Sequence, residues 1–194
     1  MFEVFRQHGM SKMLWHSETK NFQSQQTGWV TFGHMSYPKL HKEGVIGADF
    51  HCAAFKFAFV RNPYERFVSL YYHFQRHKLI DKMSLLEFAK ALDKEGVDEV
   101  GLYNQKGLSQ ANPQARWLYD DEGKCVVDFI GRFHKMEDHW ESLLVALGVP
   151  HEGLPRLNKR GTSQLGWREL LDIKTKDWVR NVYAEDFETF GFTK

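Results

Sequence analysis

Cysteine and long apolar runs are both scarce in this sequence. Cys52 and Cys125 are the only cysteines among 194 residues, which excludes a disulfide framework, and we expect both thiols to be buried as small apolar side chains. Uninterrupted apolar stretches such as 57–60 and 143–147 are short, whereas a membrane-spanning helix needs about 18 residues. Residues 1–12 lack the apolar segment of a signal peptide, so we expect a cytoplasmic chain without a targeting segment.

The sequence also lacks an excess of one charge sign, because it contains 26 basic and 25 acidic side chains. The basic residues are nevertheless unevenly placed. Segments 56–82 and 156–180 each carry an excess of four positive charges, so the remainder of the chain is acidic. This distribution indicates one or two focused anion sites and no general nucleic-acid-binding surface.

The length predicts a single domain with one packed core. Short apolar, aromatic-rich and β-branched segments predict strands, while apolar residues at spacings of three and four predict helices. Strands that alternate with helices indicate an α/β fold with parallel strand pairing. The expected strands are 29–32, 56–62 and 126–131; the expected helices are 2–8, one from Pro63, one after Ser84 with Glu87 completing a capping box, 136–147 and 175–187; the expected irregular segments are 17–28 and 93–115.

The strand over 56–62 and the helix that follows it carry the strongest candidate site. Arg61 lies at the carboxyl end of the strand, where ligands of α/β sheets bind and where a helix N-terminus offers backbone N–H groups. Helical spacing places Ser69 on the same face as Arg66, away from the apolar face. The planar set of donors on Arg61 suits a phosphate, and the Ser69 hydroxyl is free to meet a ligand. The alternative is that both arginines pair with carboxylates such as Glu65 and that Ser69 only faces solvent.

Two histidines raise the question of a metal site. His73 and His77 are four residues apart, a spacing found in two-histidine ligand pairs. The sequence offers no obvious third ligand nearby, so we expect no metal and interpret the pair as part of a solvated basic helix face.

Three segments resemble one enzyme family in order and spacing. The segment FKFAFVRNPYERFVSLYYHF at 55–74 closely resembles the 3′-phosphate-binding segment of carbohydrate and Golgi-type sulfotransferases. DFIGRFHKMEDHWESLLVALGVP at 128–150 and VYAEDFETFGF at 182–192 agree with later segments of that family. The resemblance extends over about residues 29–192.

The resemblance implies a P-loop-NTPase-like three-layer α/β sandwich and a sulfuryl donor, 3′-phosphoadenosine 5′-phosphosulfate (PAPS). Arg61 and Ser69 match the arginine and serine that hold the donor's 3′-phosphate in the family. Lys159 and Arg160, in LNKRGTS, are candidates for a basic loop over the nucleotide, with a plain solvated loop as the alternative.

The segment GHMSY at 33–37 is similar to the GHVSY segment of heparan sulfate 2-O-sulfotransferases, which implies that His34 is the catalytic base. A neutral imidazole can accept a proton from an attacking sugar hydroxyl. The alternative role for His34 is a surface or structural one. Gln114 and Arg116 lie where the family's acceptor-side loops fall, so they are candidates for acceptor contacts.

The family's 5′-phosphosulfate loop, a Pro-Lys-x-Gly-Thr-Ser type turn, has no counterpart in this sequence; segment 9–12 has suitable residue types but no preceding strand. We therefore expect residues 1–194 to form one sulfotransferase-like domain that is incomplete at its N-terminus. The expected function is sulfuryl transfer from PAPS to a hydroxyl group, most simply of a carbohydrate. The alternative is a catalytically inactive remnant that binds nucleotide or a protein partner. A nucleotide or sugar kinase would need a Gly-Lys-Ser/Thr loop, which the sequence lacks.

Overall fold

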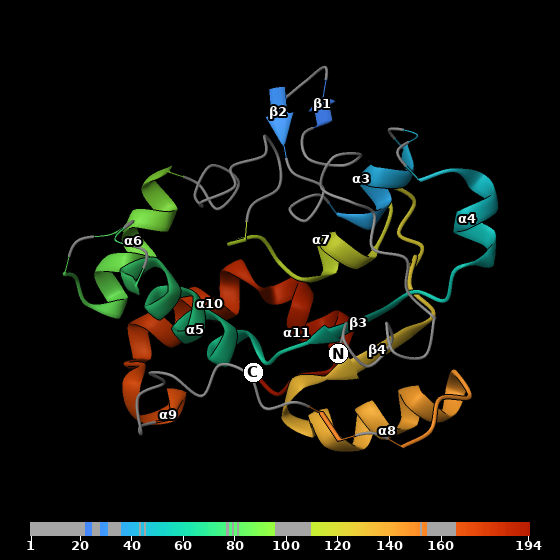
Figure 1. The fold of residues 1–194 in the computed structure, drawn as a ribbon. Coiled ribbons are helices and arrows are strands. Elements are labelled where there is room, and N and C mark those ends of the chain that lie inside the picture. The colour runs from blue at the N-terminus through green and yellow to red at the C-terminus, as the bar shows by residue number, and fades with distance from the viewer. Residues whose placement is uncertain are drawn as a thin grey trace.

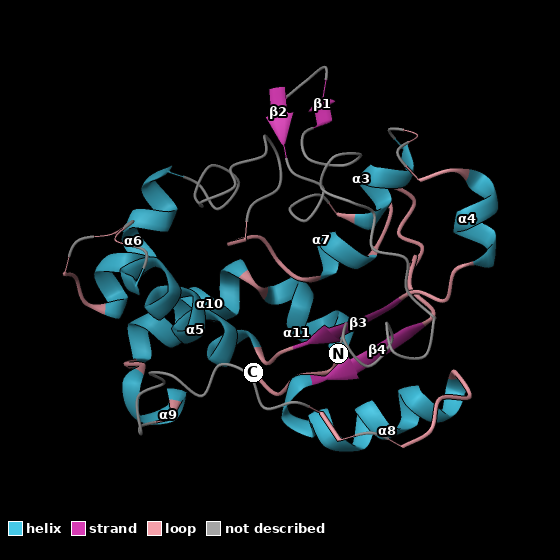
Figure 2. Ribbon diagram, viewed as in Figure 1, coloured by secondary structure: helices cyan, strands magenta, loops and turns pink. Residues whose placement is uncertain are grey.

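The structure is a mixed arrangement of helices around small β-sheets (Figures 1 and 2). It is a computed structural model, and the residues it describes are 22–24, 28–30, 36–42, 44, 46–76, 78, 80, 82–95, 110–151, 153–154 and 166–194. In chain order the elements are β1 (Phe22–Ser24), β2 (Gly28–Val30), α3 (Tyr37–Lys42), α4 (Ala48–Ala53), β3 (Phe57–Val60), α5 (Pro63–Arg76), α6 (Leu85–Glu95), α7 (Ala115–Leu118), β4 (Phe129–Arg132), the 3₁₀ turn η2 (Phe133–Lys135), α8 (Met136–Ala146), α9 (Trp167–Leu170), α10 (Ile173–Val182) and α11 (Ala184–Phe190).

Strands β3 and β4 form the parallel pair that the sequence predicted. Phe57 aligns with Phe129 and Val60 with Arg132, although the two strands are far apart in sequence. A second, antiparallel pair joins β1 to β2. The prediction of an irregular segment over 17–28 was therefore wrong at β1, because three residues there form strand pairing.

The side chains of the parallel pair alternate between two helical layers. Phe57 and Phe59 pack against α8, where Trp140 and Leu143 are buried. Val60 joins the larger core on the opposite face, which is built from α5, α6, α10 and α11. Figure 1 shows α8 on one side of the strands and α11 on the other. Helices thus flank the small parallel sheet; the P-loop-like three-layer arrangement stays a prediction.

The predicted helix from Pro63 is confirmed as α5, and its apolar face supplies the centre of the core. Phe67 and Phe74 are almost fully buried against Phe88 of α6. The start of α6 is fixed by the predicted capping box: the Ser84 backbone N–H donates to Glu87 Oε2 at 2.6 Å, and the Glu87 N–H contacts Ser84 Oγ at 3.2 Å.

The C-terminal segment forms two helices where the sequence predicted one over 175–187. Helix α10 ends at Val182, and α11 begins at Ala184. Asp172 caps α10 by accepting the Thr175 N–H at 2.7 Å. The break directs Tyr183 into the core, where it is 1% exposed.

Two other properties complete the fold. Cys52 is exposed on α4, so the prediction of a buried thiol was wrong there; Cys125 is partly buried. Helix α4 buries none of its residues, which leaves the thiol no core to enter. None of the helices in the described ranges combines the length and hydropathy required to cross a bilayer.

Candidate functional site

Arg61 and Ser69 line the same cavity. It is an open hollow of about 200 Å³ that extends along the side of α5 from the end of β3. Whole-ligand pockets measure about 300–1,000 Å³, so this cavity suits a phosphate group and its immediate attachment rather than an entire nucleotide. The residues that line it are Arg61, Arg66, Ser69, Leu70 and His73.

The cavity lies along the side of α5 and not at its N-terminus. The Asn62 side-chain oxygen accepts the Tyr64 backbone N–H at 2.9 Å, which occupies one of the free donors of the first helical turn. Ser69 projects from the second turn of the helix, beyond that cap. An anion bound here would therefore be held mainly by side chains, which revises the expected contribution of the helix N-terminus.

The Arg61 guanidinium is oriented by two neighbours. Its Nε lies 3.4 Å from Glu65 Oε2, and its Cζ lies 4.7 Å from the centre of the Phe133 ring. Its side chain is 27% exposed, so the group remains open to a ligand. The alternative considered from sequence, a pair between Arg61 and Glu65, is thus present, and it coexists with access to the cavity.

Arg66 is a second guanidinium in the cavity wall. Its Nη2 donates to the Gln110 carbonyl at 2.6 Å, and its Cζ lies 5.5 Å from the centre of the Tyr183 ring. Burial raises the pKa of the Tyr183 phenol to about 12; the cation of Arg66 opposes this rise, and the carboxylate of Asp186 adds to it. Tyr183 therefore stays protonated, and the positive charge on this wall comes from the arginines.

Gln114 binds the backbone of Arg61 and does not line either of the cavities described here. Its Oε1 accepts the Arg61 N–H at 2.8 Å, and its Nε2 donates to the Arg61 carbonyl at 2.8 Å. The same Nε2 donates to Asp186 Oδ2 at 3.1 Å, and Asp186 Oδ1 accepts the Ala115 N–H at 2.9 Å. Gln114 and Arg116, the two residues predicted to contact an acceptor, are thus separated, because Arg116 lines a different and larger cleft.

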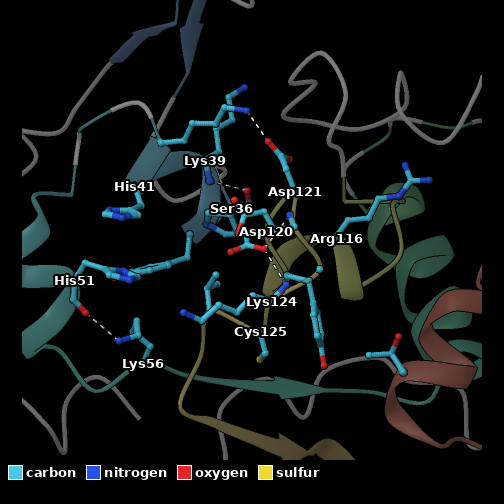
Figure 3. Close-up of a pocket in the computed structure, with 18 of the residues that line it drawn as sticks. Ser36, Lys39, His41, His51, Lys56, Arg116, Asp120, Asp121, Lys124 and Cys125 are labelled. Atoms are coloured by element: carbon cyan, nitrogen blue, oxygen red, sulfur yellow. Dashed lines mark hydrogen bonds and ion pairs between the residues drawn. The ribbon is translucent and has the colours of Figure 1, made fainter.

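A larger cleft of about 1200 Å³ opens between α3, α4, α7 and the turn over 119–126 (Figure 3). Arg116 contributes to its wall and lies 3.9 Å from Glu185 of α11. Across the cleft, Lys42 Nζ binds Asp121 Oδ2 at 2.6 Å, which joins α3 to the turn. Polar and apolar groups contribute about equally to the lining of the cleft, and side chains of both charge signs occur in it.

Rings and a partly buried amine form the other wall of the cleft. His41 and His51 stack in parallel, and the Tyr37 hydroxyl lies 3.0 Å from His51 Nδ1. Lys56 Nζ donates to two carbonyl oxygens of the α4 segment and lies 3.1 Å from Asp128. The Lys56 backbone N–H, which donates to this carboxylate at 2.7 Å, is the main reason that the pKa of Asp128 lies below its usual value.

The model of the sulfotransferase family matches residues 10–193, nearly the whole chain. The chain belongs to the sulfotransferase family. Neither the curated proteins nor the solved structures include a significant match. Membership agrees with the resemblance that the sequence analysis drew from 55–74, 128–150 and 182–192.

Three residues predicted for this sulfotransferase-family site, His34, Lys159 and Arg160, lie outside the described residues. Arg66 and His73 were not predicted to bind a ligand, although helical spacing placed Arg66 on the same face as Ser69. In the large cleft, the sequence predicted a role for Arg116, and Ser36 and Tyr37 belong to the GHMSY segment. The other lining residues carried no sequence signal, because they come from segments that only the fold brings together. Within the described part of the chain, no three His, Cys, Asp or Glu side chains are close enough to hold a metal ion.

Proposed function

We propose that the chain binds PAPS and transfers its sulfuryl group to a hydroxyl group of a carbohydrate. Membership of the sulfotransferase family supports sulfuryl transfer as the reaction class. The donor and the acceptor are inferred from the motifs and from the two cavities.

One observation carries the proposal: Arg61 and Ser69 line the same small cavity after β3. A guanidinium supplies a planar set of donors that matches phosphate oxygens, and a hydroxyl adds one more donor. Arg66 adds a second positive charge to the same wall. We therefore assign the 3′-phosphate of the donor to this cavity.

The acceptor is assigned to the larger cleft. Ser36 and Tyr37, which belong to the same GHMSY segment as His34, line that cleft, and so does Arg116. The charged side chains of both signs in its lining suit a molecule with many hydroxyl groups. This assignment places the acceptor next to the segment that carries the proposed base.

In the proposed reaction, His34 takes the proton of the acceptor hydroxyl as the oxygen attacks sulfur. The new sulfur–oxygen bond forms while the bond from sulfur to the 5′-phosphate oxygen breaks, and that oxygen keeps the electron pair. The products are a sulfate ester and adenosine 3′,5′-bisphosphate. General-base assistance of this kind is typically worth about 10² to 10⁴ in rate.

A second function, nucleotide binding without transfer, is favoured by one feature of the sequence. No Pro-Lys-x-Gly-Thr-Ser type turn is present to stabilise charge on the leaving oxygen. Loss of such a group typically lowers the rate by about 10² to 10³. Binding and turnover therefore need separate measurements.

Calorimetry with adenosine 3′,5′-bisphosphate tests binding, and transfer of radiolabelled sulfate from PAPS to a panel of glycans tests turnover. Arg61→Ala is expected to weaken bisphosphate binding about 10- to 150-fold, because a hydrogen bond to a charged group contributes about 1.5–3 kcal/mol. Arg76→Ala, at the far end of α5, is the matched control for net charge and should leave affinity unchanged.

Equal affinity in wild type and Arg61→Ala would overturn the assignment of the 3′-phosphate. Tight bisphosphate binding without transfer to any glycan would favour the non-catalytic alternative.

A further inference from the structure

We infer that Gln114 and Asp186 are positioning residues for Arg61, which hold its backbone so that the guanidinium meets the 3′-phosphate. The inference rests on the proposed function of the small cavity. It changes the expected role of Gln114 from acceptor contact to support of the donor site.

Gln114 satisfies both backbone groups of Arg61 with a single amide. Its Oε1 accepts the Arg61 N–H, and its Nε2 donates to the Arg61 carbonyl, both at 2.8 Å. A residue of a neighbouring antiparallel strand would offer the same acceptor and donor through its backbone C=O and N–H. The side-chain amide therefore extends the pairing of β3 by one residue, to the position that carries the guanidinium.

Asp186 fixes the orientation of that amide. An ionised carboxylate only accepts hydrogen bonds, so the contact of 3.1 Å to Asp186 Oδ2 must come from Nε2 of Gln114. A flipped amide would place Oε1 against both the carboxylate and the Arg61 carbonyl. The other carboxylate oxygen accepts the Ala115 N–H at 2.9 Å, so Asp186 also anchors the start of α7.

Burial protects the anchor of this arrangement. Asp186 is 0% exposed and Ala115 is 1% exposed, so water does not compete for the bond between them, whereas the bonds that Gln114 makes to Arg61 and to Asp186 are partly buried. The bonds connect residues 61, 114 and 186, which belong to three separate parts of the chain. The backbone of Arg61 is therefore fixed to α7 and α11 before a ligand arrives.

A fixed backbone is valuable because a guanidinium binds phosphate well only in the correct plane. Glu65 and Phe133 orient the far end of the Arg61 side chain, and Gln114 fixes its base. Less conformational freedom is then lost on binding, which raises affinity without a new contact to the ligand. Replacement of a residue that acts in this way should weaken phosphate binding only while Arg61 is present.

The test is a double-mutant cycle with adenosine 3′,5′-bisphosphate, measured by calorimetry on the full chain. The four proteins are wild type, Arg61→Ala, Gln114→Glu and the double variant. Gln114→Glu keeps the shape but replaces the donor with a second carboxylate oxygen beside Asp186. We expect about tenfold weaker binding in the wild-type background, the effect of losing about one hydrogen bond, and almost none when Arg61 is absent.

Gln75→Glu is the matched control, because the amide of Gln75 donates to the Tyr71 hydroxyl in the same helix that carries Ser69. It should leave the affinity unchanged. If Gln114→Glu does not fold, Gln114→Met, which adds no charge, takes its place in the cycle.

Equal weakening in both backgrounds, or unchanged affinity in a folded variant, overturns the positioning role. Failure of both variants to fold also overturns it, in favour of a purely structural one. The proposed function fails differently: wild type then shows no bisphosphate binding, or Arg61→Ala binds as tightly as wild type.

Discussion

His41 and His51 stack face to face, with ring centres 4.0 Å apart and an angle of 10° between the ring planes. His41 Nδ1 lies 3.3 Å from the Ile46 carbonyl, which only accepts, so this nitrogen carries the proton. His51 Nδ1 meets the Tyr37 hydroxyl at 3.0 Å. The stack joins α3 to α4 on the wall of the large cleft.

This stack predicts a loss of stability in acid. Burial lowers the pKa of His51, and the charges of His41, Lys56 and Lys124 add to the effect, while Asp128 opposes it. Because the folded pKa is below the unfolded one, the unfolded state binds more protons as the pH falls through about 6.5. The free energy of unfolding should therefore decrease below that pH, until the folded protein also becomes protonated.

Urea unfolding at several pH values between 7.5 and 5 measures the effect. His51→Asn, which retains a polar group near Tyr37, should show a smaller decrease than wild type. His151→Asn, at an exposed histidine beside Glu141, should keep the wild-type dependence. An unchanged slope in His51→Asn would show that the stack is not responsible.

Ser69→Ala is expected to weaken adenosine 3′,5′-bisphosphate binding about tenfold, because a hydrogen bond to a charged group contributes about 1.5 kcal/mol or more. Ser69 lines the small cavity, and alanine removes only its hydroxyl. Ser142→Ala is the control, since that hydroxyl donates to the Asp138 carbonyl within α8. Calorimetry decides the question: equal affinity for Ser69→Ala and wild type would remove Ser69 from the phosphate site.

Gly131→Ala is expected to destabilise the fold by about 1–3 kcal/mol, the usual effect of overpacking. A Cβ at Gly131 would clash with the ring of Phe59, its partner in the parallel register. The Phe59 ring has little space in which to move away from the added methyl group, since it contacts the rings of Phe57 and Phe129.

Guanidinium chloride unfolding of Gly131→Ala measures the loss. Gly153→Ala is the control, because its Cβ would meet no atom within 4 Å. Adding Phe59→Leu to Gly131→Ala should recover part of the stability, because the smaller side chain leaves room for the new Cβ. No loss in Gly131→Ala alone would show that the ring moves freely.

Local patterns predicted the parallel strands and the longer helices, but not the short helices α3, α4, α7 and α9. The capping box at Ser84 and Glu87 fixed the start of α6, because both of its hydrogen bonds form within four residues. The apolar spacing from Pro63 predicted α5, because helical periodicity also depends only on residues that are close in the sequence. The break at Tyr183 was missed, since burial of its ring depends on packing against distant elements and not on helical periodicity.

Some contacts of the candidate site follow from the local sequence, and others depend on the tertiary structure. Arg61 and Ser69 are close because a strand that leads directly into a helix places the strand end beside the first two turns. This arrangement depends only on residues that are neighbours in the sequence. The bonds of Arg61 to Gln114, and of Gln114 to Asp186, span 53 and 72 residues. No local rule specifies them: buried polar groups take whichever partners the packed helices bring within reach, so only the tertiary structure decided that Gln114 supports Arg61.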